Sequence, residues 1–327
     1  MRAVQLHKFG GAEELFIADI PAPARKEGEV LVKVHASALN RADLLQRAGK
    51  YPPPEGESDI LGLEMAGEVV EYDPGSPWRK GDRVMGLLAG GGQAEYVCVP
   101  DGMLMPVPKN LTFTQAAAIP EVFLTAYQTL FLEGQSKSGQ IALIHAGGSG
   151  VGTAAIQLAR EAGIEVFVTC SAGKHDVCLA LGATLAIDYK HEAFDEVILE
   201  KTDSKGVNII LDFIGGPNFK PNIHSLASGG KLVLIAMMGG IKAADINLMP
   251  ILQKHLTILG TTLRSRPLTY KEALVKAFAD KYLGRFEEET IKPVVDSVFK
   301  LADIAQAHRY MEANKNTGKI VIELSGK

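Results

Sequence analysis

The residues best placed to do chemistry are the glycines that separate an apolar run from a helical pattern. The segment 147–152 reads Gly-Gly-Ser-Gly-Val-Gly, between the apolar run 141–145 and the alanine-rich stretch 151–162. Glycines at a strand-to-helix turn let backbone N–H groups approach a phosphate, and the helix N-terminus adds a favourable dipole. The spacing is not the plain GxGxxG pattern, so a glycine-rich connection without a ligand stays an alternative. The strand–turn–helix context favours a dinucleotide pyrophosphate, which would be bound by Gly147, Ser149, Gly150, Val151 and Gly152.

The end of the next predicted strand bears on which dinucleotide binds. An NAD site usually places Asp or Glu there to hold the ribose 2′-hydroxyl. This chain instead has Ser171, Gly173 and Lys174, with no carboxylate before Asp176. A 2′-phosphate prefers cationic donors, so NADPH is favoured over NADH. Tyr189, at the end of the third strand, offers a further donor; a solvated lysine and a surface tyrosine are the alternatives.

Composition argues against several classes of protein. The chain has 327 residues, 46% of them hydrophobic, and a formal net charge of −4. This length suits two domains, and the charge gives no sign of a nucleic-acid or membrane-surface partner. The apolar runs are too short to span a bilayer, and the first residues show no signal-peptide pattern. Three cysteines, an odd number, fit the reducing cytosol, and we expect all three to be structural.

The N-terminal third of the chain is predicted to be mainly β. Residues 30–37 alternate as a half-buried strand does, and a short helical pattern follows Asn40. Residues 60–72 form a long apolar run with glycines, and 83–88 and 93–99 are further short strands. Close turn signals between these strands indicate a small barrel or sandwich.

Beyond residue 108 the pattern changes to alternating strands and helices. Strands are expected at 141–145, 165–169, 184–189, 207–213, 232–237 and 255–262, and helices at 114–118, 121–132, 151–162, 193–201, 217–227, 270–283 and 301–313. Continuous apolar strands that alternate with helices predict a parallel, doubly wound sheet. His145 lies inside the first of these strands, and we expect it to be a packed core residue. A last strand at 319–324 could return to the β domain.

Motifs spread over nearly the whole chain resemble one superfamily. They are the segments 36–43 (ASALNRAD), 61–67 (LGLEMAG), 91–96 (GGQAEY), 115–120 (QAAAIP) and 312–321 (EANKNTGKIV), together with the glycine turn. As a set they resemble the medium-chain dehydrogenase/reductase superfamily, in its zinc-free quinone oxidoreductase branch. The resemblance implies an α/β protein with a GroES-like β-barrel domain (residues 1–122 and 264–327) and a Rossmann doubly wound parallel sheet (residues 123–263). In this superfamily the active cleft lies between the two domains.

Zinc is the informative absence within this resemblance. Zinc-dependent members carry Cys at the position of Asn40 and His at the position of Leu63, and they have a four-cysteine lobe. This chain has neither ligand, and its three cysteines are too few for the lobe. Glu64 alone cannot make a zinc site, so we expect it to be structural and the protein to bind no metal.

The resemblance also implies the remaining site residues. It places Asn40 and Tyr51 in the catalytic cleft, with the Asn40 amide facing the nicotinamide or the acceptor and the Tyr51 phenol donating to a quinone oxygen. A helix cap for Asn40 and a loop-packing role for Tyr51 are the alternatives. Many members have Gly where this chain has Ser149, whose hydroxyl either binds the ligands or stabilises the turn. Further cofactor contacts are expected from the later loops, at Met237, Leu263, Ser265 and Asn314.

These features predict an NADPH-dependent quinone oxidoreductase that needs no metal. The nicotinamide supplies the hydride, so the protein needs mainly positioning and hydrogen-bond donors, and the chain shows no Ser-His-Asp or paired-carboxylate pattern. An NADPH-dependent alkenal or enone reductase, and a non-catalytic NADPH-binding redox sensor, are the alternatives. We expect a cytoplasmic protein with a small-molecule quinone or enone substrate. We also expect a homodimer, with residues 255–262 as the sheet edge that pairs.

Overall fold

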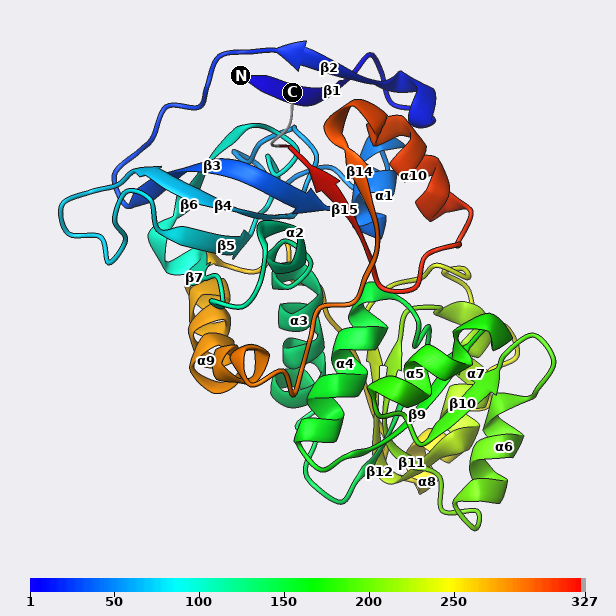
Figure 1. Ribbon diagram of the computed structural model, residues 1–327. Coiled ribbons are helices and arrows are strands. Elements are labelled where there is room, and N and C mark those ends of the chain that lie inside the picture. The colour runs from blue at the N-terminus through cyan, green and yellow to red at the C-terminus, as the bar shows by residue number, and fades with distance from the viewer. Residues whose placement is uncertain (325–327) are drawn as a thin grey trace. The chain divides into compact units, whose positions relative to one another are not determined.

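In the computed structural model, which describes residues 1–324, six parallel strands form the sheet that carries the glycine turn (Figure 1). The strand order is β10-β9-β8-β11-β12-β13, and every neighbouring pair is parallel. The chain runs outward from β8 to one edge and then returns to β11, which is the doubly wound arrangement predicted from the sequence. The strands are β8 (Ile141–Ile144), β9 (Glu165–Cys170), β10 (Leu185–Asp188), β11 (Val207–Asp212), β12 (Leu226–Leu234) and β13 (Thr257–Gly260).

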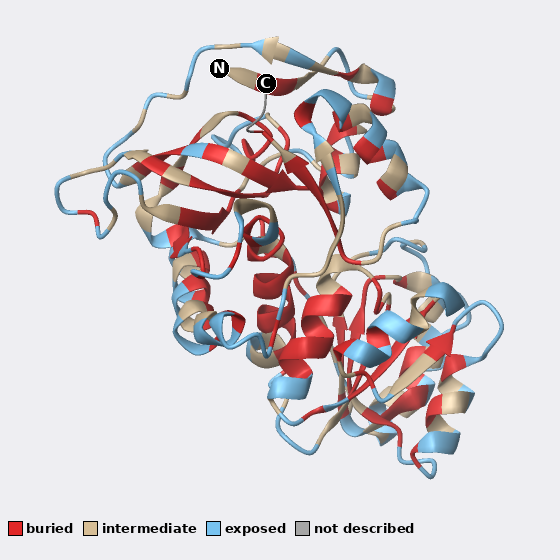
Figure 2. Ribbon diagram, in the orientation of Figure 1, coloured by how far each residue is buried: buried red, intermediate tan, exposed pale blue. Residues whose placement is uncertain are grey.

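Helices cover this sheet and bury its central strands. They are α4 (Gly150–Glu161), α5 (His175–Leu181), α6 (Phe194–Lys201), α7 (Gly216–Ser225) and α8 (Met249–Gln253). Strands β8, β9 and β11 are largely buried (Figure 2), and Leu143, Ile210 and Leu232 have no exposed surface. Strands buried on both faces read as continuous apolar runs, which explains why the sequence predicted them well.

A second, mainly antiparallel sheet is built from both ends of the chain. Its order is β14-β15-β3-β4-β5-β7, with β6 also paired to β3, and β1 and β2 form a separate two-stranded ladder. The strands are β1 (Arg2–Leu6), β2 (Leu15–Asp19), β3 (Glu29–Ala38), β4 (Glu64–Glu71), β5 (Arg83–Leu87), β6 (Tyr96–Pro100), β7 (Leu104–Pro106), β14 (Val295–Lys300) and β15 (Lys319–Glu323). Its helices are α1 (Arg41–Arg47), α2 (Phe113–Ala116), α9 (Leu268–Glu287) and α10 (Ile304–Glu312), and α3 (Pro120–Tyr127) follows α2 in the chain.

The last strand returns to the first sheet, as the sequence suggested. β15 pairs antiparallel with β3, and Val321 lies opposite Ala38. This pairing brings the residues just before it, 314–319, to the end of β3 and the start of α1. Two segments almost 280 residues apart therefore meet at Asn40, which no local pattern in the sequence could show.

The contacts divide the chain into two units. The first joins Met1–Leu124 to the segment that begins at Leu263, and the second is Thr125–Thr262. Sequence analysis predicts these boundaries at residues 122–123 and 263–264.

Some predicted elements were wrong in extent. Strand β12 begins at Leu226, where a helix was predicted to continue to 227, and it ends at Leu234 instead of 237. Gly229 and Gly230 weaken the local strand signal, and the pairing of β12 with β11 is irregular between Leu226 and Lys231, where they lie. The predicted helix 121–132 is α-helical only to Tyr127 and continues as a π-helical turn, Gln128–Glu133. Strand β14 was not predicted, because its half-exposed residues gain strand structure only by pairing with β15.

Within residues 1–324, no helix is both long enough and apolar enough to cross a membrane.

Candidate active site and cofactor-binding turn

Ser149 closes the turn between β8 and α4. It is the residue before the helix, and its Oγ accepts the N–H of Gly152 at 3.0 Å while its carbonyl accepts the N–H of Thr153 at 2.8 Å. The helix itself supplies no acceptor for its first N–H groups, so those of Gly150 and Val151 remain for an external acceptor such as a phosphate. The Ser149 hydroxyl is therefore engaged in holding the turn, which leaves those two N–H groups available.

Two positions of the turn must be glycine, because neighbouring atoms lie too close for a side chain. A Cβ on Gly152 would lie 2.4 Å from the carbonyl oxygen of Ala146, and a Cβ on Gly147 would lie 2.6 Å from Cβ of Val168. Both distances are too short for any side chain, so only glycine lets α4 start this close to β8 and β9. Glycines with these packing and turn roles fit a dinucleotide-binding turn.

Lys174 lies against the same turn. A Cβ on Gly148 would be 2.6 Å from Cδ of Lys174, so the lysine stem rests on the bare glycine backbone. Ser171 is half-buried, Gly173 is exposed, and the first carboxylate after β9 is the exposed Asp176. Residues 171–174, which follow β9, thus place a lysine stem against the glycine turn and include no acidic residue. Tyr189, which follows β10, is 57% exposed.

A row of buried polar side chains, joined by hydrogen bonds, lies next to the turn and was not predicted from the sequence. His145 accepts or donates at both ring nitrogens, 2.8 Å from Thr169 Oγ1 and 2.7 Å from Asn222 Oδ1. Asn222 Nδ2 donates to Asp212 at 3.0 Å, so the Asn222 oxygen is the acceptor and we assign the His145 proton to Nε2. Burial lowers the pKa of His145, although the negative charge of Asp212 opposes this. His145 is fully buried and neutral in this network, which ties β8 to α7.

Asp212 connects this row of hydrogen-bonded side chains to the loop after β11. Its Oδ1 accepts the N–H groups of Ile214 at 2.7 Å and Gly215 at 3.1 Å, so it shapes the loop after β11. The signal in the sequence that could have revealed this role was an Asp at the end of an apolar run, followed by the glycines at 215 and 216.

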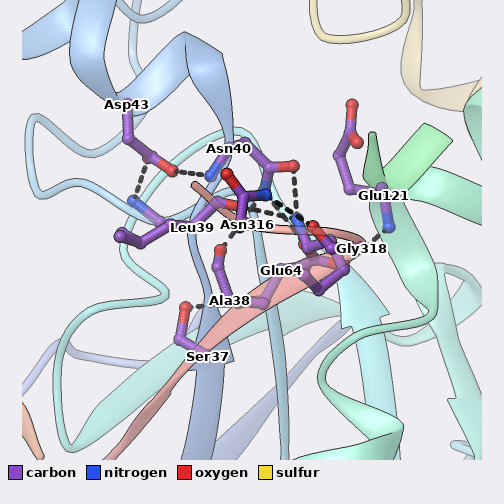
Figure 3. Close-up of polar contacts among 12 residues, drawn as sticks. Ser37, Ala38, Leu39, Asn40, Asp43, Glu64, Glu121, Asn316 and Gly318 are labelled. Atoms are coloured by element: carbon purple, nitrogen blue, oxygen red, sulfur yellow. Dashed lines mark hydrogen bonds and ion pairs between the residues drawn. The ribbon is translucent and has the colours of Figure 1, made fainter. Parts of the chain in front are cut away.

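In the first unit, Asn40 lies in a buried polar network (Figure 3). Its Nδ2 donates to Glu64 Oε1 at 2.9 Å and to the Ala38 carbonyl at 3.2 Å, and its Oδ1 accepts from Lys319 at 2.6 Å. Asn40 also precedes α1, and its backbone N–H donates to Asp43 at 2.7 Å. Both amide hydrogens are engaged by Glu64 and Ala38, so they are not available to a quinone oxygen in this arrangement. That Asn40 faces the nicotinamide or the acceptor stays a prediction.

Lys319 is the partner that sequence reasoning missed. Its ammonium lies 2.7 Å from Glu64 Oε1 and donates to the Leu39 carbonyl at 2.7 Å, and the two side chains are 4% and 0% exposed. The other carboxylate oxygen of Glu64 accepts the N–H of Glu121 at 2.9 Å (Figure 3). Buried charges persist when they are paired and hydrogen-bonded, as these are. Glu64 is therefore held by a lysine and two N–H donors.

Asp43 is the second buried carboxyl in this network. Its oxygens accept the N–H groups of Asn40 at 2.7 Å and Gly62 at 2.9 Å. Burial raises the pKa of Asp43 to about 6, because desolvation outweighs the two backbone hydrogen bonds and the nearby Lys319 charge. Asp43 joins α1 to the loop before β4.

Tyr51 lies under a buried arginine. The guanidinium of Arg264 is 5.3 Å from the centre of the Tyr51 ring, and it donates to the Ala89 carbonyl at 2.8 Å and to Gln46 Oε1 at 2.7 Å. Burial raises the pKa of the Tyr51 phenol, and the Arg264 charge partly offsets this. Tyr51 is half-exposed, so its ring is fixed while part of its surface stays open to solvent. Sequence analysis assigns no role to Arg264.

The other predicted cofactor residues differ in exposure. Met237 is 42% exposed in the loop after β12, whereas Leu263 is 8% exposed and Ser265 is exposed. Asn314 is exposed at positive φ, and its side-chain oxygen accepts a hydrogen bond from Arg41. Met237 belongs to the second unit, and the other three residues belong to the first. That all four contact the cofactor stays a prediction.

No cluster of three or more His, Cys, Asp or Glu side chains suited to a metal ion occurs among residues 1–324. At the position where zinc-dependent members have a ligand, Asn40 binds a lysine ammonium instead.

Comparison with known proteins identifies the family. Two family models match the chain, an alcohol dehydrogenase GroES-like domain at residues 26–109 and a zinc-binding dehydrogenase domain at residues 150–280. The chain is 35% identical to the rat synaptic vesicle membrane protein VAT-1 homolog, covering 98% of this chain and 84% of that protein. It is 32% identical to human quinone oxidoreductase, covering 99% of this chain and 98% of that protein. The chain belongs to the medium-chain dehydrogenase/reductase superfamily.

Solved structures agree with this assignment. One, described as an NAD-dependent alcohol dehydrogenase, has a TM-score of 0.88 at 32% identity and covers 99% of this chain and 100% of that one. Another, mycobacterial Rv1454c complexed with NADPH, has a TM-score of 0.89 at 28% identity with the same coverage. The predicted fold class, a GroES-like β domain with a Rossmann-type sheet, is confirmed. Oxidoreductases of this superfamily bind a nicotinamide cofactor, and the glycine turn, with no room for side chains, fits one.

Proposed function

We propose that this member of the superfamily is an NADPH-dependent quinone reductase that uses no metal. The observation that carries the cofactor choice is the position of Lys174. This lysine follows the end of β9, its stem rests on Gly148 of the glycine turn, and no Asp or Glu lies between Cys170 and Lys174 in the sequence. A lysine there suits a 2′-phosphate, whereas an acidic residue would hold a free 2′-hydroxyl. The chain is similar both to a protein described with NAD and to one described with NADPH, so likeness supports either cofactor. The choice of NADPH in this proposal therefore depends on Lys174.

When bound, the nicotinamide supplies hydride chemistry. The N–H groups of Gly150 and Val151 would hold the pyrophosphate at the start of α4, and Lys174 would pair with the 2′-phosphate. Tyr51, oriented by Arg264, would donate its phenol hydrogen to an oxygen of the acceptor. Phenolates formed from a quinone take protons from water, so one positioned donor is sufficient.

The quinone is favoured as acceptor by likeness and by the hydrogen bonds that already engage two buried carboxyl groups of the first unit. Human quinone oxidoreductase is similar to this chain over nearly its whole length. Lys319 and Asn40 hold Glu64, and backbone N–H groups hold Asp43, so both buried carboxyl groups are engaged within the first unit. An enone reductase would need a proton at a carbon atom, and Tyr51 is the one candidate donor identified in the first unit.

The test is oxidation of NADPH with 1,2-quinones, 1,4-quinones and an enal, repeated with NADH and after treatment with a chelator. Turnover of quinones with NADPH, unchanged by the chelator, is expected. Turnover confined to the enal would replace the proposal by alkene reduction. Tight NADPH binding without any turnover would favour a non-catalytic binding protein, and activity lost on chelation would overturn the metal-free mechanism.

Variants connect the activity to the residues. Lys174→Met is expected to raise the KM for NADPH roughly 10- to 100-fold, the value of one charged hydrogen bond, with little change for NADH. Lys190→Met, an exposed lysine after β10, is the matched control. Tyr51→Phe is expected to lower kcat roughly 100-fold, as loss of a proton donor does. Tyr270→Phe is its control, because Tyr270 also lies under an arginine, Arg266, at 4.9 Å.

A further inference from the structure

Two cysteines of the second unit lie side by side. Cys170 ends β9 and Cys178 lies in α5, and their sulfur atoms are 3.8 Å apart, with the Cys178 thiol donating to Cys170. Both are unbonded thiols, and they are 3% and 0% exposed. A structural role, as predicted from the sequence, does not require two thiols to face each other.

Cys170 differs in reactivity from the other two cysteines. The hydrogen bond to Cys170 and burial raise the pKa of the Cys178 thiol. The hydrogen bond from Cys178 lowers the pKa of Cys170, and the positive charge of Lys174 acts in the same direction against burial. Burial raises the pKa of Cys98, in β6, to about 11. Because the thiolate is the nucleophile, Cys170 is the thiol of this chain that is set up to react, although Cys98 is more exposed.

Cys178 lies in a short helix that is partly exposed to solvent. Helix α5 has seven residues, and Val177 and Leu179, on either side of Cys178, are 37% and 44% exposed. A short surface helix of this kind opens locally at much lower free energy than the whole fold. Small oxidants therefore have a route to the pair without global unfolding.

We propose that Cys170 and Cys178 form a redox-active dithiol that a peroxide closes to an intramolecular disulfide. The Cys170 thiolate attacks one peroxide oxygen and becomes a sulfenic acid, and the other oxygen leaves as hydroxide and takes up a proton. The Cys178 sulfur then attacks the sulfenic sulfur, its proton is released, and the displaced hydroxide leaves as water. In sum, two thiols lose two electrons and two protons, and hydrogen peroxide becomes two molecules of water.

Closure would act on the segment that carries Lys174. A disulfide needs sulfur atoms about 2.05 Å apart, so the pair must approach by about 1.8 Å from its present 3.8 Å. The chain between the two cysteines holds Ser171, Gly173 and Lys174, and Lys174 rests on Gly148. This consequence rests on the proposed function: oxidation is expected to weaken NADPH binding roughly tenfold, through loss of the Lys174 contact.

The first experiment reads the bond directly and needs no cofactor. The full-length protein is treated with hydrogen peroxide, its remaining thiols are alkylated under denaturing conditions, and it is digested with trypsin. Trypsin cleaves after Arg160, Lys174 and Lys190, so the disulfide would join peptides 161–174 and 175–190. We expect this linked pair, two fewer alkylated thiols, reversal by dithiothreitol, and the same result in Cys98→Ser. Failure of the two peptides to link, or oxidation of Cys98 before them, would overturn the proposal.

The second measurement compares NADPH affinity before and after oxidation. Weaker binding in the oxidised wild type, restored by dithiothreitol and absent in Cys178→Ser, supports the link to the cofactor. A disulfide that forms without changing the Kd would overturn that link. Reduced protein that binds no NADPH would instead contradict the proposed function, while the peptide experiment would still decide whether the dithiol exists.

Discussion

At the scale of single residues, the polar side chains of the first unit are bound to one another. Asn40 and Glu64 are close in the sequence motifs and could be predicted to meet, but their cation comes from Lys319, 279 residues from Asn40. A short polar motif predicts which residues gather at a site. It does not predict a partner supplied by strand pairing, because that contact exists only after β15 has joined β3.

Lys319→Met tests whether this buried ion pair stabilises the fold. The substitution leaves the Glu64 carboxylate, 0% exposed, without a cation, and such a loss costs about 3–5 kcal/mol of unfolding free energy. The double variant Lys319→Met/Glu64→Gln removes both charges and is expected to recover most of that loss. Urea unfolding of the three proteins measures both effects. Equal destabilisation by the single and double variants would show that the lysine acts through packing and not through its charge.

Asp43 makes stability depend on pH. Its pKa is about 6 in the folded protein against 3.8 for an unperturbed carboxyl, so the folded state binds this proton more tightly than the unfolded chain does. The contribution of Asp43 is therefore most favourable below pH 3.8 and is lost as the pH rises to about 6, by roughly 2–3 kcal/mol.

The variant Asp43→Asn removes this titration. Relative to the wild type, its unfolding free energy should improve between pH 4 and pH 7, and the exposed Asp176→Asn should show no such difference. Unfolding curves at both pH values measure it. A pH dependence identical to that of the wild type would contradict the raised pKa.

At the scale of elements, the strand–turn–helix unit at β8 and α4 was predicted from the sequence, to within one residue at each end. Its strand is an apolar run and its turn is glycine-rich; the strand ends at Ile144 instead of 145, and the helix begins at Gly150 instead of 151. The first and last residues of β12 and the existence of β14 were not predicted, because both depend on pairing with a neighbouring strand. Tyr51 could be named by resemblance, but its orientation depends on Arg264 and Gln46, which approach from other elements.

Gly152→Ala tests the element that binds the cofactor. The added methyl group would lie 2.4 Å from the Ala146 carbonyl oxygen, so the start of α4 must shift and NADPH affinity should fall roughly tenfold or more. Gly284→Ala, in α9, is the matched control, because nothing lies within 4 Å of its added methyl group. It should leave binding unchanged and raise stability by about 0.5–1 kcal/mol. Titration with NADPH distinguishes them, and unchanged affinity in Gly152→Ala would show that the turn does not hold the cofactor.

At the scale of the whole molecule, the parallel sheet of the second unit has two edges, β10 and β13. Thr261 donates its N–H inward to Leu234 at 3.0 Å, and alternation along the strand then directs the N–H groups of Ile258 and Gly260 to the free edge. Exposed apolar side chains gather in the segment just before β13: Met237, Met238, Ile241, Ile246, Leu248, Met249 and Leu252. An unprotected edge beside an apolar surface is the usual setting for pairing between two copies.

We therefore expect a homodimer joined through β13. Light scattering should give a mass of about 70 kDa, twice the 35.0 kDa of the chain. Gly260→Pro removes an outward N–H without touching the bond to Leu234, so it should produce a monomer that still binds NADPH. Leu252→Lys, which places a charge at a side chain now 70% exposed, should weaken the dimer if the apolar segment also lies in the interface. A wild-type mass near 35.0 kDa at micromolar concentration would contradict the dimer. A dimer unaffected by Gly260→Pro would place the interface elsewhere than at the β13 edge.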